Sequence, residues 1–397
     1  MGPKARKVGK YRRGQSLAVV IVLFVACIVA AGCGDSGSSG NDGPVKIGLL
    51  WPFTGFASNY GPDGEAGVKL ALAQAGMKVG DRKVELVTAN EDVLDPSKAL
   101  QAAKKLVEQD GADIVLGPVF GSSQEAVSAY LASRKVLWVA PLSGSADIAK
   151  TKSLILWPGV DTTHASPMGP YMAKELGYSK IATLAPDYIY GKNLIKGAAD
   201  TFEAAGGEVV QQQWVPLGTT DLLPYASKLD KSADALVMWL VPQDAASFVR
   251  AFRGLKIDMP LIMVNGIFDP TFQEIGSEVV GELGIVDWSL GIKTPENRSF
   301  VSAFLKRNGT LPNNNNAAAY ANTQLVLAAI EEAGGSTDLD DLRAVWQKIR
   351  VDTPFGPAKI GADGVAITSR TIVKATKSSD GRFVWEPVAT FNNVSGP

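Results

Sequence analysis

Short apolar runs rich in β-branched residues alternate with amphipathic runs along most of the chain, beginning at residue 45. The apolar runs are bounded by Gly, Pro or Asp, as buried strands usually are. In the stretch 96–110, the apolar residues instead recur at helical spacing with Lys and Glu on the opposite face, which predicts a helix. The predicted strands of this first set cover residues 45–51, 84–88, 113–116 and 136–140.

A second set of alternating elements begins at residue 180. Strands are predicted at 180–184, 208–215, 235–240 and 260–264, and helices at 191–205 and 245–255. Strands that alternate with helices are typical of parallel sheets with right-handed crossovers. Two such sets in series predict an α/β fold of two doubly wound parallel-sheet lobes joined by a hinge.

The chain is predicted to cross between the lobes at the ends of the second set. The extended segments 154–161 and 284–292 are interpreted as crossings, and the predicted strands within 360–387 are candidates for a third. Ligands bind at the carboxyl ends of strands in open α/β sheets, so two facing lobes predict a hinged cleft. The predicted division is a signal peptide (1–32), a flexible tether (33–44), lobe 1 (45–161 plus 292–368) and lobe 2 (162–291 plus 369–397).

Three further helices are expected after the second crossing. They cover residues 295–308, 317–333 and 339–350. The run of asparagines at 313–316 is polar throughout and is expected to form a surface loop between the first two.

The amino terminus has the layout of an export signal. Six basic residues precede an uncharged apolar run at 17–31, which is shorter than the roughly 20 residues of a membrane-spanning helix. The end of the run and the next two residues read Ala30, Ala31, Gly32 and Cys33, which resembles a bacterial lipobox and implies a lipid on Cys33. The Gly-, Ser- and Asp-rich stretch that follows suits a flexible tether. The alternative is ordinary secretion with Cys33 as an unmodified thiol.

Charge and cysteine content restrict the partners and the source of stability. Removal of residues 1–32 leaves 33 basic and 40 acidic residues. Nucleic-acid binding requires clustered Lys and Arg to displace counterions, so a nucleic-acid partner is not expected. Cys27 is removed with the signal peptide and only Cys33 is left, so an intramolecular disulfide is excluded and the fold depends on its hydrophobic core.

The residues that catalysis would require are scarce. His164 is the only histidine, which argues against a two-histidine metal site and a histidine-assisted nucleophile, and it is expected on a helix surface. Neither a G-x-S-x-G elbow nor a phosphate-binding G-x-x-x-x-G-K-[ST] loop occurs. We therefore expect no enzyme, metal or cofactor. A lipoprotein hydrolase is the alternative, and it would turn its ligand over.

Several short motifs, in their order and spacing, resemble a known family. Residues 45–50, 115–119, 140–143, 187–191 and 353–357 read VKIGLL, VLGPV, APLS, DYIYG and TPFGP. Together they resemble the type I periplasmic binding proteins that serve branched-chain amino acid and related ABC importers. The resemblance implies a monomeric, lipid-anchored extracytoplasmic protein that delivers a small molecule to a permease and its ATPases. A lipoprotein that senses a ligand for a membrane receptor is an alternative with the same binding site.

The resemblance also implies which residues of lobe 1 form the pocket. The segment 120–122 follows a strand and opens a helix, so its N–H groups and hydroxyl are expected to receive a carboxylate, although Ser122 alone would also serve as a helix cap. Amino acid binders usually have Thr at the position of Gly144, so one hydroxyl for an α-amino group is missing. The implied residues are Tyr60, Phe120, Gly121, Ser122, Leu142, Ser143 and Gly144.

At the first crossing and in lobe 2, the resemblance implies a second group of pocket residues. Asp161 corresponds to an acidic residue that pairs with a ligand ammonium, although the segment 161–163 is also a good helix start. Asn265 stands where amino acid binders commonly have Glu. The implied residues are Asp161, Tyr190, Trp239, Asn265 and Gly266.

These substitutions and the aromatic content change the expected ligand. Gly144 and Asn265 alter two of the three features that recognise an α-amino group. Aromatic side chains bind ring-bearing ligands through buried area and stacking. We therefore expect an aromatic carboxylate, a short amide or an atypical amino acid ahead of leucine. The aromatic residues at the predicted cleft are Phe56, Tyr60, Phe120, Tyr190 and Trp239.

Overall fold

The computed structural model describes residues 2, 43–55, 57–268 and 271–394. The predicted signal peptide, most of the tether, Cys33 and Phe56 lie outside the described residues. Two sheets of mostly parallel strands, with helices packed against them, confirm the predicted α/β class with two lobes.

The first sheet has six strands in the order β2-β3-β1-β4-β5-β6. All neighbours are parallel except the short β2, which pairs antiparallel with β3. Both faces are covered: Ile47 and Leu49 pack into one core and Leu50 into another. The strands are β1 (Val45–Trp51), β2 (Lys78–Val79), β3 (Arg82–Asn90), β4 (Ile114–Leu116), β5 (Leu137–Ala140) and β6 (Leu154–Leu156).

The second sheet follows the order β12-β13-β14-β11-β10-β9-β7-β8, with β15 paired to β14. The strands from β7 to β11 are parallel, and β14 runs antiparallel to β11. The strands are β7 (Lys180–Pro186), β8 (Glu208–Val215), β9 (Ala235–Met238), β10 (Leu261–Val264), β11 (Leu283–Val286), β12 (Arg350–Thr353), β13 (Gly356–Ile360), β14 (Ala366–Lys377) and β15 (Phe383–Val394).

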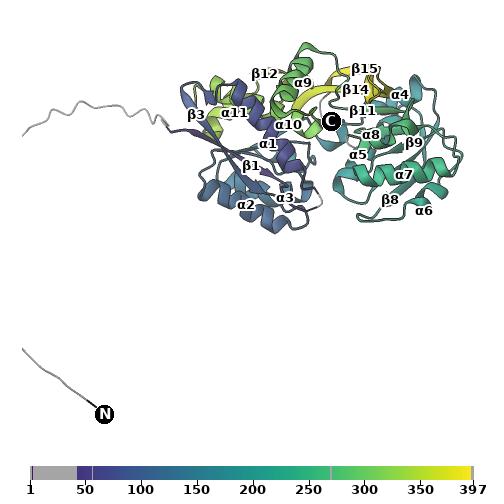
Figure 1. Cartoon of the computed structure of the whole chain (residues 1–397), viewed down its shortest axis with the longest axis horizontal. Coiled ribbons are helices and arrows are strands. Elements are labelled where there is room, and N and C mark those ends of the chain that lie inside the picture. Colours follow the sequence, from purple (N-terminus) through teal and green to yellow (C-terminus); the bar gives the residue numbers. More distant parts are fainter. Residues whose placement is uncertain (1, 3–42, 56, 269–270, 395–397) are drawn as a thin grey trace, which may run out of the picture. The chain divides into compact units, whose positions relative to one another are not determined.

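The helices divide between the two sheets. Residues of α1, α9, α10 and α11 share one core with the first sheet, and α2 and α3 cover its other face, whereas α4 to α8 belong to the second sheet (Figure 1). The helices are α1 (Tyr60–Gln74), α2 (Pro96–Glu108), α3 (Gly121–Ser133), α4 (Met168–Lys174), α5 (Ile189–Ala204), α6 (Leu223–Ser227), α7 (Pro242–Gly254), α8 (Thr271–Val279), α9 (Pro295–Asn308), α10 (Asn314–Glu332) and α11 (Leu339–Trp346), with short 3-10 turns η1 (Ile148–Lys150) and η2 (Asp161–Thr163).

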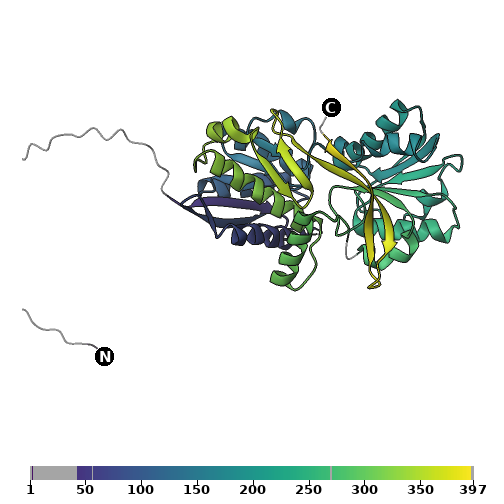
Figure 2. The ribbon, with the colours of Figure 1, turned by 90° about the horizontal axis from the view of Figure 1, so that it is seen from above.

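Strand β14 connects the two lobes. Its first residue, Ala366, belongs to the core of the first sheet, and Val373 belongs to a core of the second. It pairs with β13 at one end and with β11 further along (Figure 2). The segments after β6 and β11 also leave their sheets and lead into the other lobe.

The expectation of a polar surface loop at 313–316 is wrong. Asn313 caps α10: its side-chain oxygen accepts a hydrogen bond from the backbone N–H of Asn316, and the side-chain oxygen of Asn316 accepts one from the backbone N–H of Asn313. Asn315 and Asn316 are buried because both donate to Asp63 of α1, at 3.3 Å and 2.8 Å. A partner distant in the sequence therefore turned a polar run into the buried first turn of a helix.

Candidate functional site

A cavity of about 220 Å³ lies at the carboxyl ends of strands from both sheets. Of the twelve residues predicted for the pocket, eleven line it, and Ser122 is exposed on α3 outside the lining. The eleven are Tyr60, Phe120, Gly121, Leu142, Ser143, Gly144, Asp161, Tyr190, Trp239, Asn265 and Gly266.

On the side of lobe 1, the cavity meets the amino-terminal end of α3. The preceding residue, Phe120, has no polar side chain to cap the helix, so first-turn N–H groups such as that of Gly121 are available to an anion. Glu91 fixes the chain segment directly before this helix, because its buried carboxylate accepts hydrogen bonds from the N–H groups of Val119 and Phe120 at 2.7 Å and 2.9 Å. Burial raises the pKa of Glu91 to about 7, although these two hydrogen bonds partly offset the effect.

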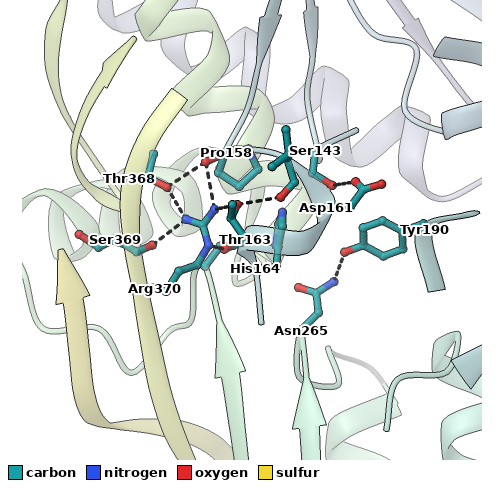
Figure 3. Close-up of polar contacts among 12 residues, drawn as sticks. Ser143, Pro158, Asp161, Thr163, His164, Tyr190, Asn265, Thr368, Ser369 and Arg370 are labelled. Carbon is teal, nitrogen blue, oxygen red and sulfur yellow. Dashed lines mark hydrogen bonds and ion pairs between the residues drawn. The ribbon is translucent and has the colours of Figure 1, made fainter. Parts of the chain in front are cut away.

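Ser143 and Asp161 form a buried polar contact at the cavity wall. Ser143 has a left-handed backbone (φ 82°), and its hydroxyl donates to Asp161 Oδ1 at 2.7 Å (Figure 3). Asn193 of α5 donates to the other carboxylate oxygen at 3.1 Å. Burial raises the pKa of Asp161, and the hydrogen bonds from Ser143 and Asn193 lower it in part. Each carboxylate oxygen keeps a lone pair that a ligand donor can use.

Lobe 2 provides an aromatic wall. The rings of Tyr190 and Trp239 meet edge to face, with centroids 5.0 Å apart, and Tyr188 lies 6.1 Å from Trp239. Asn265 donates to the Tyr190 hydroxyl at 3.0 Å, which fixes the phenol ring. Across the cavity, Tyr60 and Phe120 form a second ring pair at 5.9 Å. The cavity is therefore lined by rings from both lobes.

A buried charge cluster lies beside this wall. Asp287 follows β11, and its two oxygens lie 2.8 Å from Arg370 Nε and 2.6 Å from His164 Nδ1. Burial by itself opposes ionisation of Asp287, but the Arg370 guanidinium and His164 outweigh it and lower the pKa of the carboxyl. Arg370 also donates to the carbonyl of Pro158 at 3.1 Å (Figure 3). The cluster thus joins residues that follow β6 and β11 to a residue of β14.

The expected surface position of His164 is wrong. The side chain is 4% exposed and lines the cavity, because Asp287 holds its Nδ1 from a distant part of the sequence. Its Nε2 has no hydrogen-bond partner among the residues that the structure describes.

Other cavity residues carried only a weak signal in the sequence. Tyr188 lies inside a motif already noted, and Asp287 stands directly after a strand, where ligands of parallel sheets are expected. Gln124 and Asn314 lie within helices and gave no such signal.

The described part of the chain contains neither a candidate membrane span nor a candidate metal-binding cluster. None of its helices combines the length and apolar character that crossing a membrane requires. None of its His, Cys, Asp and Glu side chains form a group of three or more able to hold a metal ion.

Known proteins resemble the chain over most of its length. The chain is 26% identical over 365 residues to Leu/Ile/Val-binding protein homolog 6 of Brucella suis biovar 1 (strain 1330), with 89% of this chain and 93% of the relative covered. A solute-binding protein of an ABC transporter from Rhodopseudomonas palustris BisB5, in complex with 3,4-dihydroxybenzoic acid, superposes with a TM-score of 0.83 at 25% identity, covering 89% of this chain and 99% of that one. Another from R. palustris, in complex with 4-hydroxybenzoate, gives 0.81 at 25% identity, covering 88% and 98%.

The family match covers most of the chain as well. Residues 44–382 match the periplasmic binding protein family. Proteins of this kind are extracytoplasmic solute-binding subunits of ABC transporters and not enzymes, and they deliver ligands to permease and ATPase subunits. The chain therefore belongs to the type I periplasmic binding proteins of the branched-chain amino acid family.

Proposed function

We propose that this chain is the lipid-anchored, extracytoplasmic solute-binding subunit of an ABC importer, and that it binds a small carboxylate with an aromatic ring. Such a ligand is an aromatic acid or an aromatic amino acid. The observation that carries this proposal is the cavity itself, which combines ring-lined walls with a helix amino terminus.

The rings support an aromatic ligand over an aliphatic one. Tyr188, Tyr190 and Trp239 on one side and Tyr60 and Phe120 on the other present flat apolar faces and edges to a small space. A bound ring gains buried area together with edge-to-face contacts worth about 0.5–1.5 kcal/mol per pair. A leucine side chain gains only the area.

The first turn of α3 supports the carboxylate. Its N–H groups and the helix dipole favour an anion next to Gly121. The two R. palustris structures add support, because they contain hydroxylated benzoic acids.

The proposed binding cycle is closure of the two lobes on the ligand. We assign residues 45–161 plus 292–368 to lobe 1 and 162–291 plus 369–397 to lobe 2, with the hinge at the three junctions. In the described state the two assigned lobes are in contact beside the cavity, since Asn193 donates to Asp161 at 3.1 Å. A ligand that contacts both lobes stabilises this state by its differential affinity, and the closed monomer then docks on the permease.

Thermal unfolding with a ligand panel tests the proposed function. The full-length protein in detergent is heated with benzoate, 4-hydroxybenzoate, L-phenylalanine, L-leucine and glucose. A ring-bearing carboxylate is expected to stabilise the fold by about 2.7 kcal/mol at a hundredfold excess over its dissociation constant, and so to raise the midpoint. A rise with leucine or glucose alone would contradict the aromatic assignment.

The anchor is tested at the cysteines. Cells that express the protein are fed labelled palmitate, and the purified chain is expected to carry the label on Cys33 in the wild type and to lose it in Cys33→Ser. Cys27→Ser is the matched control, and it should keep the label because this residue lies inside the apolar run. Equal labelling of wild type and Cys33→Ser, or an unlabelled wild type, would rule out the anchor.

A further inference from the structure

Gln124 holds a fixed, buried acceptor beside the cavity wall. Its side-chain Nε2 donates to the carbonyl oxygens of Pro118, Val119 and Ser143 at 3.2, 3.0 and 2.9 Å. Three carbonyl partners fix which end of the amide is the nitrogen. The opposite end, Oε1, is buried and has no partner among the described residues, although the side chain lines the cavity.

Gly144 leaves the space that this oxygen occupies. A Cβ added at Gly144 would lie 2.6 Å from Gln124 Oε1, much closer than side-chain atoms approach one another in proteins. Glycine at 144 and glutamine at 124 are therefore compatible, and a larger residue at 144 would displace the acceptor. The side-chain carbonyl oxygen of Gln124, from helix α3, thus lies where a side chain at position 144 would begin.

Asp161 adds a second acceptor at the same place. Its backbone N–H donates to the carbonyl of Gly144 at 2.9 Å, and its carboxylate receives the Ser143 hydroxyl. Ser143 thus contacts both Gln124 and Asp161. An amide oxygen and a carboxylate that converge on one pair of residues form a wall that accepts hydrogen bonds and favours a donor opposite.

We infer that Gln124 Oε1 is a specificity determinant that, together with Asp161, receives an N–H or O–H donor of the bound ligand. The inference rests on the proposed function and narrows it: the carboxylate that binds here carries an amino or hydroxyl group. A ligand without the donor would leave this buried acceptor unpaired. Binding sites reject such ligands strongly, because an unpaired buried polar group costs free energy.

Isothermal titration with two matched pairs tests this inference. The pairs are L-phenylalanine with 3-phenylpropanoate, which lacks the amino group, and 4-hydroxybenzoate with benzoate, which lacks the hydroxyl. In the full-length protein, at least one pair is expected to show dissociation constants that differ by roughly tenfold or more. The pair that discriminates identifies the donor as an amine or a hydroxyl.

Two variants test the role of Gln124 Oε1 in different ways. Gln124→Leu removes Oε1, and Gly144→Ala displaces it. Both variants are therefore expected to reduce the ratio of the two dissociation constants within a ligand pair to about threefold or less. Affinity for the donor-free member should change little. Glu125→Gln, at the next and exposed position of α3, is the control and should keep the wild-type ratio. If Gln124→Leu does not fold, Gly144→Ala decides the result.

The outcomes separate the inference from the function on which it rests. Equal affinity within both pairs in the wild type would overturn the role of Gln124 and leave an aromatic carboxylate binder. Parallel loss of affinity for both members in the variants would also overturn it, since that result indicates a structural role only. Absence of binding by all four probes would contradict the proposed function itself.

Discussion

Replacing Asp287 with alanine is expected to lower the free energy of unfolding by about 3–5 kcal/mol. The carboxylate is 4% exposed and lies between Arg370, which is fully buried, and His164. Without it the guanidinium stays buried with only neutral partners, such as the carbonyl of Pro158. Urea unfolding of the wild type and Asp287→Ala at pH 7 measures the difference.

Two controls separate burial of charge from loss of an ion pair. Asp340→Ala breaks the exposed pair with Lys135, whose atoms lie 3.0 Å apart, and should leave the free energy of unfolding nearly unchanged. The double variant Asp287→Leu with Arg370→Met removes both buried charges and is expected to recover much of the loss, since well-packed apolar residues often replace a buried pair at little cost. A loss below about 1 kcal/mol in Asp287→Ala would show that water reaches this cluster.

The periodicity of the sequence predicted most of the scaffold because each buried strand is a local apolar run. The predicted strand at 45–51 and helix at 295–308 have the bounds of β1 and α9. The pattern does not predict α1, whose glycines lower its helix propensity. Those glycines allow close packing: a Cβ at Gly64 would lie 2.4 Å from the Trp51 ring, and one at Gly67 would lie 2.3 Å from a carbonyl of α10.

The site was predictable where it follows strand ends and not where it depends on distant partners. Ser143 and Asn265 directly follow strands or their end loops, so the rule for parallel sheets finds them. His164 needed Asp287, which lies 123 positions further along the sequence, and the asparagines in the first turn of α10 needed Asp63. Gln124 is a helical residue whose function depends on the missing side chain at Gly144. Local patterns carry no information on such pairs.

Glu91 is expected to make the unfolding free energy fall by roughly 3 kcal/mol as the pH rises from about 4.5 to 8. Its pKa is raised from the ordinary 4.5 to about 7 in the folded chain, mainly by burial. Between these values the folded protein keeps a proton that the unfolded chain releases, so stability is greatest below the unfolded pKa and is lost through the folded one. The expected loss of roughly 3 kcal/mol follows because each unit of pKa shift corresponds to about 1.4 kcal/mol.

The measurement is the difference in unfolding free energy between the wild type and Glu91→Gln across this pH range. The variant cannot titrate at this position, and its amide nitrogen faces one of the two N–H groups that donate to Glu91, so it starts less stable at pH 4.5. Asp161 and Asp63, whose pKa values are also raised, contribute equally to both proteins and cancel. The disadvantage of Glu91→Gln should therefore shrink by roughly 3 kcal/mol toward pH 8.

Glu85→Gln, exposed on β3, should instead follow the wild type at each pH. A constant difference between wild type and Glu91→Gln would mean that the carboxylate is already ionised at pH 4.5. In that case its hydrogen bonds from the residues before α3 would lower its pKa more than burial raises it.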